Sequence, residues 1–211
     1  MKNSNLIRLK TKEKLIKHGI PLHPHLPLIS GCLEKNSEDI ARRIVGLYVM
    51  LGLARDADPD LLWNWLEENE FLSFLSKDEM NILQKEQLSQ EDINVCSWKQ
   101  ESIYVLCWFV GLAEDLPHLD VESELDEMFS KLPPEISFDE LIESFSYREN
   151  DELLLALDFY YCLNAAIRHP EIWDDESKLK NIKFAAVEER RRAMEWLIAK
   201  ENNWDQIALD T

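Results

Sequence analysis

The sequence predicts an all-α protein, with a single compact domain of about eight or nine helices packed around one central apolar helix. Two observations support this class. Serine followed three residues later by an acidic or amide side chain recurs along the chain, and this capping-box spacing marks helix starts. Between these starts, apolar residues recur at the helical period. In addition, no strand-helix alternation, glycine-rich phosphate loop or internal repeat interrupts the pattern.

The central helix is expected within Ser97–Ala113, because residues 103–110 are eight consecutive apolar residues. A helix that is apolar all round must be packed on several sides. A strand is the alternative, since most of these residues also favour strands. Ser97 followed by Gln100 has the capping-box spacing, and it favours a helix that restarts at Ser97.

The first half of the chain reads as helices joined by polar turns. A helix is expected over residues 5–18, where Gly19 ends it, and three prolines then favour an extended connection over residues 19–27. Ser37 is expected to cap a helix that reaches about residue 52. Further helix starts are expected at Asp58, Ser76 and Ser89.

The second half continues in the same way after a loop at residues 111–120. Residues 121–132 read as a strongly acidic amphipathic helix, which Pro133 and Pro134 end. The remaining helices are expected from Ser137, over residues 151–168 and over residues 182–200. The Pro133-Pro134 turn is the only candidate for a weak subdivision, and both halves need the central helix, so residues 1–211 are expected to form one domain.

The balance of acidic and basic residues limits the classes of partner that the protein can bind. The 211 residues include 41 acidic and 23 basic residues, which gives a net charge of −18. Such a surface repels nucleic-acid phosphates and anionic lipid. It favours encounter with a basic protein, and the alternative is that it serves solubility alone. We therefore expect no nucleic-acid or membrane partner, and the oligomeric state stays open.

The cysteines and the N-terminus indicate a cytoplasmic protein. No CxxC pair occurs, and two cysteines lie within apolar helical runs, so all four are expected to be reduced core residues: Cys32, Cys96, Cys107 and Cys162. The N-terminus has no apolar leader segment, and no run of eighteen apolar residues occurs.

Five charged residues stand within helices that are otherwise rich in apolar positions: Glu101, Arg148, Asp158, Glu189 and Arg190. Charges are seldom buried unless they are paired. These residues are expected either to form a structural ion-pair network that holds helices in register or to line a polar pocket between helices that binds a ligand.

No catalytic, metal or cofactor site is predicted. His23 and His25 flank Pro24, but two histidines without further nearby ligands do not define a zinc site. The other histidines have no serine or cysteine partner at a recognisable spacing. Arg190–Arg192 is a compact basic run, and the acidic residues around it favour pairing within the helix.

The C-terminal stretch carries a family resemblance. Its residues Glu189, Arg190, Ala193, Trp196 and Leu197 precede a tail that begins with Trp204-Asp205 and ends with Asp210-Thr211. This pattern resembles the end of the bacterial family called domain of unknown function 4272. Arg8, Gly19–Pro21, the Trp98–Trp108 segment and the 148–160 stretch are similar to other parts of that family. Arg191 and Glu195 depart from it. The resemblance implies an intracellular, mostly helical bacterial protein and no assigned activity.

The charge favours a protein-protein interaction module, comparable to the immunity proteins that neutralise toxins. Its acidic surface is expected to comprise Glu122, Glu124, Asp126 and Glu127. The alternative is a small-ligand binder or enzyme that uses the five-residue polar cluster. A structural role through homo-oligomerisation also stays open.

Overall fold

The protein is helical throughout its regular structure. The computed structural model describes residues 2–173 and 175–209, and each regular element within these ranges is a helix. The α-helices are α1 Lys2–Lys17, α2 Ser37–Ala54, α3 Pro59–Glu68, α4 Lys77–Leu83, α5 Gln90–Ser97, α6 Lys99–Phe109, α7 Asp126–Phe129, α8 Phe138–Glu143, α9 Asn150–Arg168 and α10 Phe184–Ile198. The 3₁₀ turns are η1 Leu72–Phe74, η2 Pro170–Ile172, η3 Glu176–Asn181 and η4 Trp204–Gln206. The predicted all-α class is confirmed.

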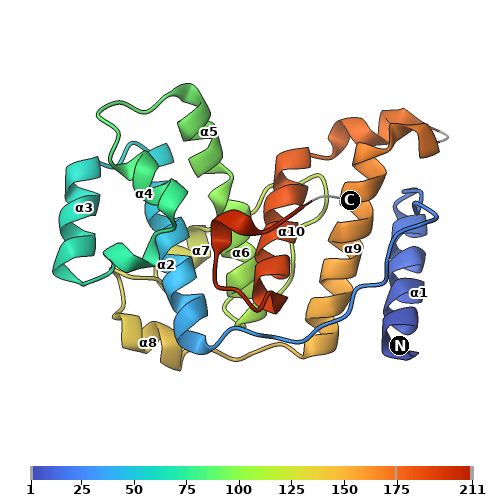
Figure 1. The fold of residues 1–211 in the computed structure, drawn as a ribbon, viewed down its shortest axis with the longest axis horizontal. Helices are drawn as coiled ribbons and strands as arrows, with labels where there is room; N and C mark the ends of the chain where they lie inside the picture. The colour runs from blue at the N-terminus through green and yellow to red at the C-terminus, as the bar shows by residue number, and fades with distance from the viewer. Residues whose placement is uncertain (1, 174, 210–211) are drawn as a thin grey trace.

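The helices are arranged in an elongated body (Figure 1). Helices α6 and α10 pack together in the middle, α9 packs on α10, and α1 covers α9 at one end. Helix α2 packs on the other side of α6, and α3, α4, α5 and α8 form the opposite end. No helix in the described ranges has the length and apolar character needed to cross a bilayer.

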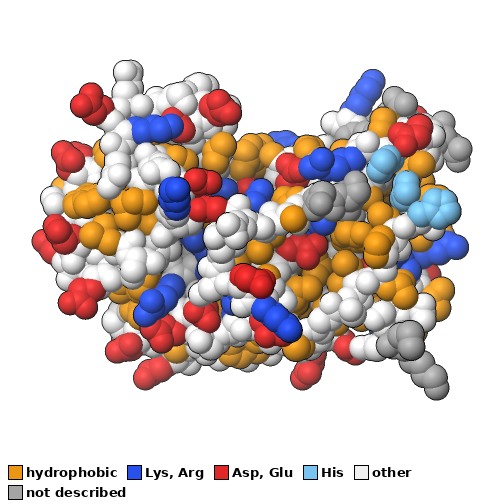
Figure 2. Space-filling model, viewed as in Figure 1, with side chains coloured by type: hydrophobic (Ala, Val, Ile, Leu, Met, Phe, Trp, Pro, Cys, Tyr) orange, Lys and Arg blue, Asp and Glu red, His pale blue; other side chains and the backbone are white. Residues whose placement is uncertain are grey.

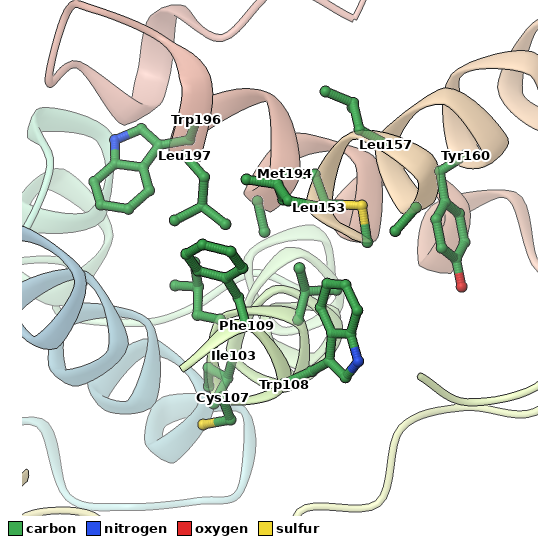
Figure 3. Packing of buried hydrophobic residues seen from close by; sticks show 14 of the residues in the cluster. Ile103, Cys107, Trp108, Phe109, Leu153, Leu157, Tyr160, Met194, Trp196 and Leu197 are labelled. Atoms are coloured by element: carbon green, nitrogen blue, oxygen red, sulfur yellow. The ribbon is translucent and has the colours of Figure 1, made fainter. Parts of the chain in front are cut away.

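The predicted central helix is confirmed in α6. From Glu101 to Val110 every residue except Tyr104 is buried. Figure 3 shows how α6 packs against two neighbouring helices. The labelled side chains are Ile103, Cys107, Trp108 and Phe109 of α6, Leu153, Leu157 and Tyr160 of α9, and Met194, Trp196 and Leu197 of α10. Because contacts come from several sides, the all-apolar run is explained without a strand.

An extended strap, residues 18–36, links α1 to α2. Gly19 adopts a left-handed backbone with φ of +66°, which ends α1 as predicted. The strap then crosses the ends of α9 and α10: the Glu34 amide donates to the Leu197 carbonyl at 2.9 Å, and Asn150 bonds the backbone of Gly31 and Leu33. The strap therefore joins the two ends of the molecule.

Four predicted helix starts are confirmed and two are wrong. Asp58 caps α3 by accepting from the Asp60 amide, as predicted. Reciprocal capping boxes open α4, α5 and α8 at Ser76, Ser89 and Ser137. Helix α2 is instead capped by Asn36, which bonds Asp39 and leaves Ser37 as the first helical residue. Ser97 does not restart the central helix, because its hydroxyl donates to the Asn94 carbonyl and completes α5.

The predicted acidic helix over residues 121–132 is also wrong. Only α7, four residues long, is helical there. The Val121 carbonyl accepts from Arg190, and the Ser123 amide donates to the Glu101 carboxylate. These backbone groups serve tertiary contacts instead of a helical ladder, so most of the segment is a loop. Leu125, just before α7, and Met128 within α7 are buried.

Three cysteines match the expectation of core positions, and one does not. Cys96, Cys107 and Cys162 are buried, and burial raises the pKa of the Cys107 thiol to about 12. Such thiols are unreactive, because the thiolate is the reactive form. Cys32 is exposed on the strap, so the expectation of a core position is wrong for this cysteine.

The C-terminal tail packs back onto the domain through Trp204, which is 4% exposed. Its ring meets Trp196 edge-to-face at 5.8 Å and lies 4.9 Å from the Arg43 guanidinium carbon.

We expect Trp204→Ala to lower the free energy of unfolding by about 3–5 kcal/mol, measured by urea denaturation. The exposed neighbour Gln206 provides the control, because Gln206→Ala should change stability by less than about 0.5 kcal/mol. Equal losses in both variants would show that the tail is not anchored by Trp204.

Candidate functional site

A buried ion pair joins the two central helices. The Arg190 Nε of α10 donates to Glu101 of α6 at 2.6 Å, and both side chains are 1% exposed or less. Glu101 also accepts from the Ser123 amide at 2.9 Å and the Ser123 hydroxyl at 2.7 Å. Arg190 donates further to the carbonyls of His118 and Val121 and to the Tyr160 hydroxyl. The polar atoms of this pair are therefore used within the protein.

The Glu101–Arg190 ion pair forms because α6 and α10 place these two residues opposite each other. Glu101 lies in the first turn of α6, where a negative charge is favourable, and Arg190 lies mid-way along α10. Burial raises the pKa of Tyr160, while the Arg190 charge opposes that shift. Tyr160 therefore stays a neutral acceptor for Arg190.

The other residues of the predicted polar cluster lie in separate contacts. Glu189 pairs with Lys99 at 2.8 Å and accepts from Ser102, again between α10 and α6. Asp158 of α9 pairs with Arg8 of α1 at 2.8 Å. The structure thus brings Glu101 and Arg190 together and places Glu189 beside them on α10.

Arg148 forms no ion pair with the other four residues of the predicted cluster. Its Nε donates to the Trp108 carbonyl at 2.9 Å, and its guanidinium carbon lies 4.9 Å from the Trp108 ring. It also donates to the carbonyls of Ala113 and Glu114. Arg148 therefore holds the loop that follows α6.

A cavity of about 390 Å³ lies beside this network, between the N-terminal helix and the loop at residues 115–119. It is lined by Lys14 of α1, by His18 of the strap, by His118, and by Phe159 and Tyr160 of α9. The His18 and His118 rings are 5.3 Å apart, and His118 bonds Asp120. Burial lowers the pKa of His18, and the His118 and Lys14 charges lower it further.

An apolar groove of about 380 Å³ opens at the other end of the molecule. The end of α2, α3 and the chain around Phe129–Pro134 line it, including Tyr48, Gly52, Arg55, Leu62 and Trp65. The Arg55 guanidinium lies 5.0 Å from the Phe129 ring. Burial raises the pKa of Tyr48, Arg55 opposes that shift, and nearby Glu135 adds to it.

The predicted acidic surface is divided between exposed and paired residues. Glu124, Asp126 and Glu127 are exposed. Glu122 is instead half-buried and bonds Lys183 and Gln100. The helix expected to present these residues is absent, and α7 carries Asp126 and Glu127 alone.

Acidic residues of the whole chain are concentrated in two stretches, the second of which includes that segment. Residues 55–98 contain eleven acidic and three basic residues, and residues 112–152 contain fourteen acidic and two basic residues. Residues 1–54 contain four acidic and nine basic residues. Figure 2 shows Asp and Glu side chains around the margin of the end that contains α3, with hydrophobic side chains between them.

The histidines form no metal site in the described part of the chain. His23 lies 4.7 Å from His169 and 6.2 Å from His25, measured between ring centroids. Figure 2 shows histidine side chains grouped at the end opposite α3. Within the described ranges, no three His, Cys, Asp or Glu residues are arranged to hold a metal ion.

Sequence reasoning missed a second buried ion pair, between Arg43 of α2 and Glu79 of α4 at 2.5 Å. Both side chains are nearly inaccessible to solvent. A signal was present, because Arg43 follows Ile40 by three residues and lies on the apolar stripe of α2. Glu79 was recognised only as part of the Ser76 capping box.

Comparisons with known proteins identify one match. The family model described as "Domain of unknown function (DUF4272)" matches residues 8–207. No curated protein and no solved structure matches the chain.

Neutralising Glu101 should destabilise the folded protein. In Glu101→Gln the Arg190 charge stays buried without its counter-charge, and the new amide must face the Ser123 amide or hydroxyl. We expect the free energy of unfolding to fall by about 3–5 kcal/mol, measured by urea denaturation. Glu122→Gln is the control, because its pair with Lys183 lies at the surface, where the two side chains are 39% and 52% exposed, and should contribute less than about 1 kcal/mol. A loss no larger than that of the control would show that the buried pair does not support the fold.

The His18 environment predicts a pH dependence. Because the folded state lowers the pKa of His18, the unfolded chain takes up the proton first as pH falls through about 6.5. Stability should therefore decrease below that pH and level off below the folded-state pKa. The His18→Gln variant should lose less stability than the wild type between pH 7 and pH 5.5, measured by urea midpoints. Parallel curves for the two proteins would contradict this origin.

Proposed function

The chain belongs to the family named domain of unknown function 4272, and we propose that it is an interaction module that binds a basic partner protein, as toxin-neutralising proteins do. One observation carries the proposal: acidic residues are segregated from basic ones. Residues 55–98 and 112–152 hold 25 of the 41 acidic residues and only five of the 23 basic ones.

This segregation favours a directed encounter. The acidic stretches include α3, α4, α5 and α8, which lie together at one end, while the lysine-rich α1 lies at the other (Figure 1). A single-signed surface raises the association rate of an oppositely charged protein and orients its approach. A basic partner should therefore meet the α3 end first.

The apolar groove at this end supplies a place for the partner to be held. Its apolar lining includes Val49, Leu51 and Leu62. The exposed acids Asp56, Asp58 and Glu135 adjoin lining residues in the sequence. Charged pairs at a rim contribute mainly rate and specificity, whereas apolar anchors in a central pocket contribute most of the affinity. We infer that the partner inserts an apolar side chain flanked by lysine or arginine.

The proposal can be tested with a synthetic peptide in which lysines flank a single tryptophan. Binding measured by calorimetry should weaken as ionic strength rises. Asp56→Asn, Asp58→Asn and Glu135→Gln, combined in one variant, should weaken binding by about tenfold. Asparagine at position 58 can still cap α3, so the fold should be retained. The matched control neutralises three exposed acids outside this surface: Glu13, Glu34 and Glu201.

A groove-filling variant separates the apolar contact from charge. A Cβ atom at Gly52 would lie no closer than 3.6 Å to its neighbours, and alanine or leucine is a better helix former than glycine. Gly52→Leu should therefore keep the fold and abolish insertion of the tryptophan. Equal weakening by the acid variant and its control, together with unchanged binding by Gly52→Leu, would overturn the proposal.

A further inference from the structure

Helix α1 carries apolar residues on two opposite faces. Ile7 and Leu15 are buried, and they lie on the face that packs on α9. Leu6, Leu9 and Ile16 are 51%, 59% and 62% exposed, and they recur at helical spacing on the opposite face. This second stripe of apolar residues is therefore left open to solvent at the end of the molecule (Figure 1).

Lysines flank the exposed stripe of α1 on both sides. With 3.6 residues per turn, Lys12 lies on one side of the stripe and Lys10 and Lys17 lie on the other, and all three are exposed. One acid, Glu13, lies within the stripe. Pairing of α1 with a second α1 would place lysine against lysine, which disfavours that contact. The stripe instead suits an acidic helix that presents an apolar residue.

Helix α3, at the other end of the molecule, has this character (Figure 1). Its Leu61 is 67% exposed, which makes it the most exposed large hydrophobic side chain in the described part of the chain. The residues around Leu61 on the outer face of α3 are exposed and acidic or polar: Asp60, Asn64, Glu67 and Glu68. Leu61 lies outside the apolar groove, because it is absent from the groove lining.

We propose that α1 of one copy packs against α3 of a second copy of this chain, head to tail. Leu61 of one copy packs on the stripe formed by Leu6, Leu9 and Ile16 of the other. The flanking lysines face the acids of α3. Because α1 and α3 lie at opposite ends of the molecule, this contact forms between copies and not within one.

The net charge of −18 on each copy opposes association, but salt reduces this repulsion selectively. At physiological salt the Debye length is about 8 Å, so distant like charges are screened while opposite charges in contact still attract. The contact is small, and small interfaces give weak, reversible complexes. The proposal shares only the separation of charge with the proposed function, because it needs neither the groove nor a different partner protein.

Two charge-reversal variants test the contact. Lys10→Glu combined with Lys12→Glu reverses both flanks of the α1 stripe, and Glu67→Lys combined with Glu68→Lys reverses α3. All four residues are exposed, and lysine suits the last turn of α3, so both variants should stay folded. Circular dichroism verifies this.

Association is measured by sedimentation equilibrium at physiological salt, from about 10 μM to 1 mM protein. The average mass of the wild type should rise with concentration, and each variant alone should associate at least about tenfold more weakly. An equimolar mixture of the two variants should regain the association, because each reversed helix then meets a complementary one.

Three further variants separate this contact from net charge and from the groove. Lys180→Glu combined with Lys200→Glu makes the same change in net charge outside α1, and it should associate nearly as the wild type does. Leu61→Gln should weaken association about tenfold. Gly52→Leu fills the groove and should leave association unchanged, so failure of this proposal is distinct from failure of the proposed function. A wild-type mass that stays constant with concentration, a mixture that shows no recovery, or an equal loss in the lysine control would each overturn the proposal.

Discussion

The buried pair between Glu101 and Arg190 is the interaction on which the central packing depends. Removing two charges from water is expensive, and the cost is offset only where the remaining polar atoms are satisfied. Here Ser123 supplies both of its donors to Glu101, and the carbonyls of His118 and Val121 accept from Arg190. The pair therefore sets the contact between α6 and α10 and also the course of the chain that leaves α6. A helix at residues 121–132 would have to break these bonds.

Similar contacts recur in three segments that are not helical: the strap, the loop after α6 and the C-terminal tail. Connecting segments leave carbonyl groups that no helix satisfies, and long cationic side chains reach them from the neighbouring elements. The cations that donate to such carbonyls are Arg8 at Leu26 and Pro27, Lys35 at Ala199 and Glu201, Arg148 at Ala113 and Glu114, and Arg191 at Leu209. These contacts order the strap, the loop after α6 and the tail. Much of the sparse positive charge of this acidic protein is therefore structural.

Local signals predicted the helices well, and long-range pairing explains where they failed. The Ser76, Ser89 and Ser137 boxes act within four residues, so sequence alone revealed them. The helix predicted over residues 121–132 does not form, because Glu101 and Arg190, which are distant in the sequence, bind the backbone groups of this segment. For the polar cluster, the embedded charges were recognised, but their partners were not: Asp158 meets Arg8 across 150 positions. Arg43 was missed because its stripe was read as apolar.

The exposed Lys10, Lys12 and Lys17 of α1 lie at the end of the molecule opposite the acidic helices α3, α4, α5 and α8, which separates positive from negative side chains along that direction. A dipole turns in the field of any charged neighbour before contact is made, over distances set by the Debye length of about 8 Å at physiological salt. In dilute buffer that length grows, and unlike charges then attract one another over a longer range. Solution behaviour at low ionic strength therefore reports on the molecule's polarity as well as on its partners.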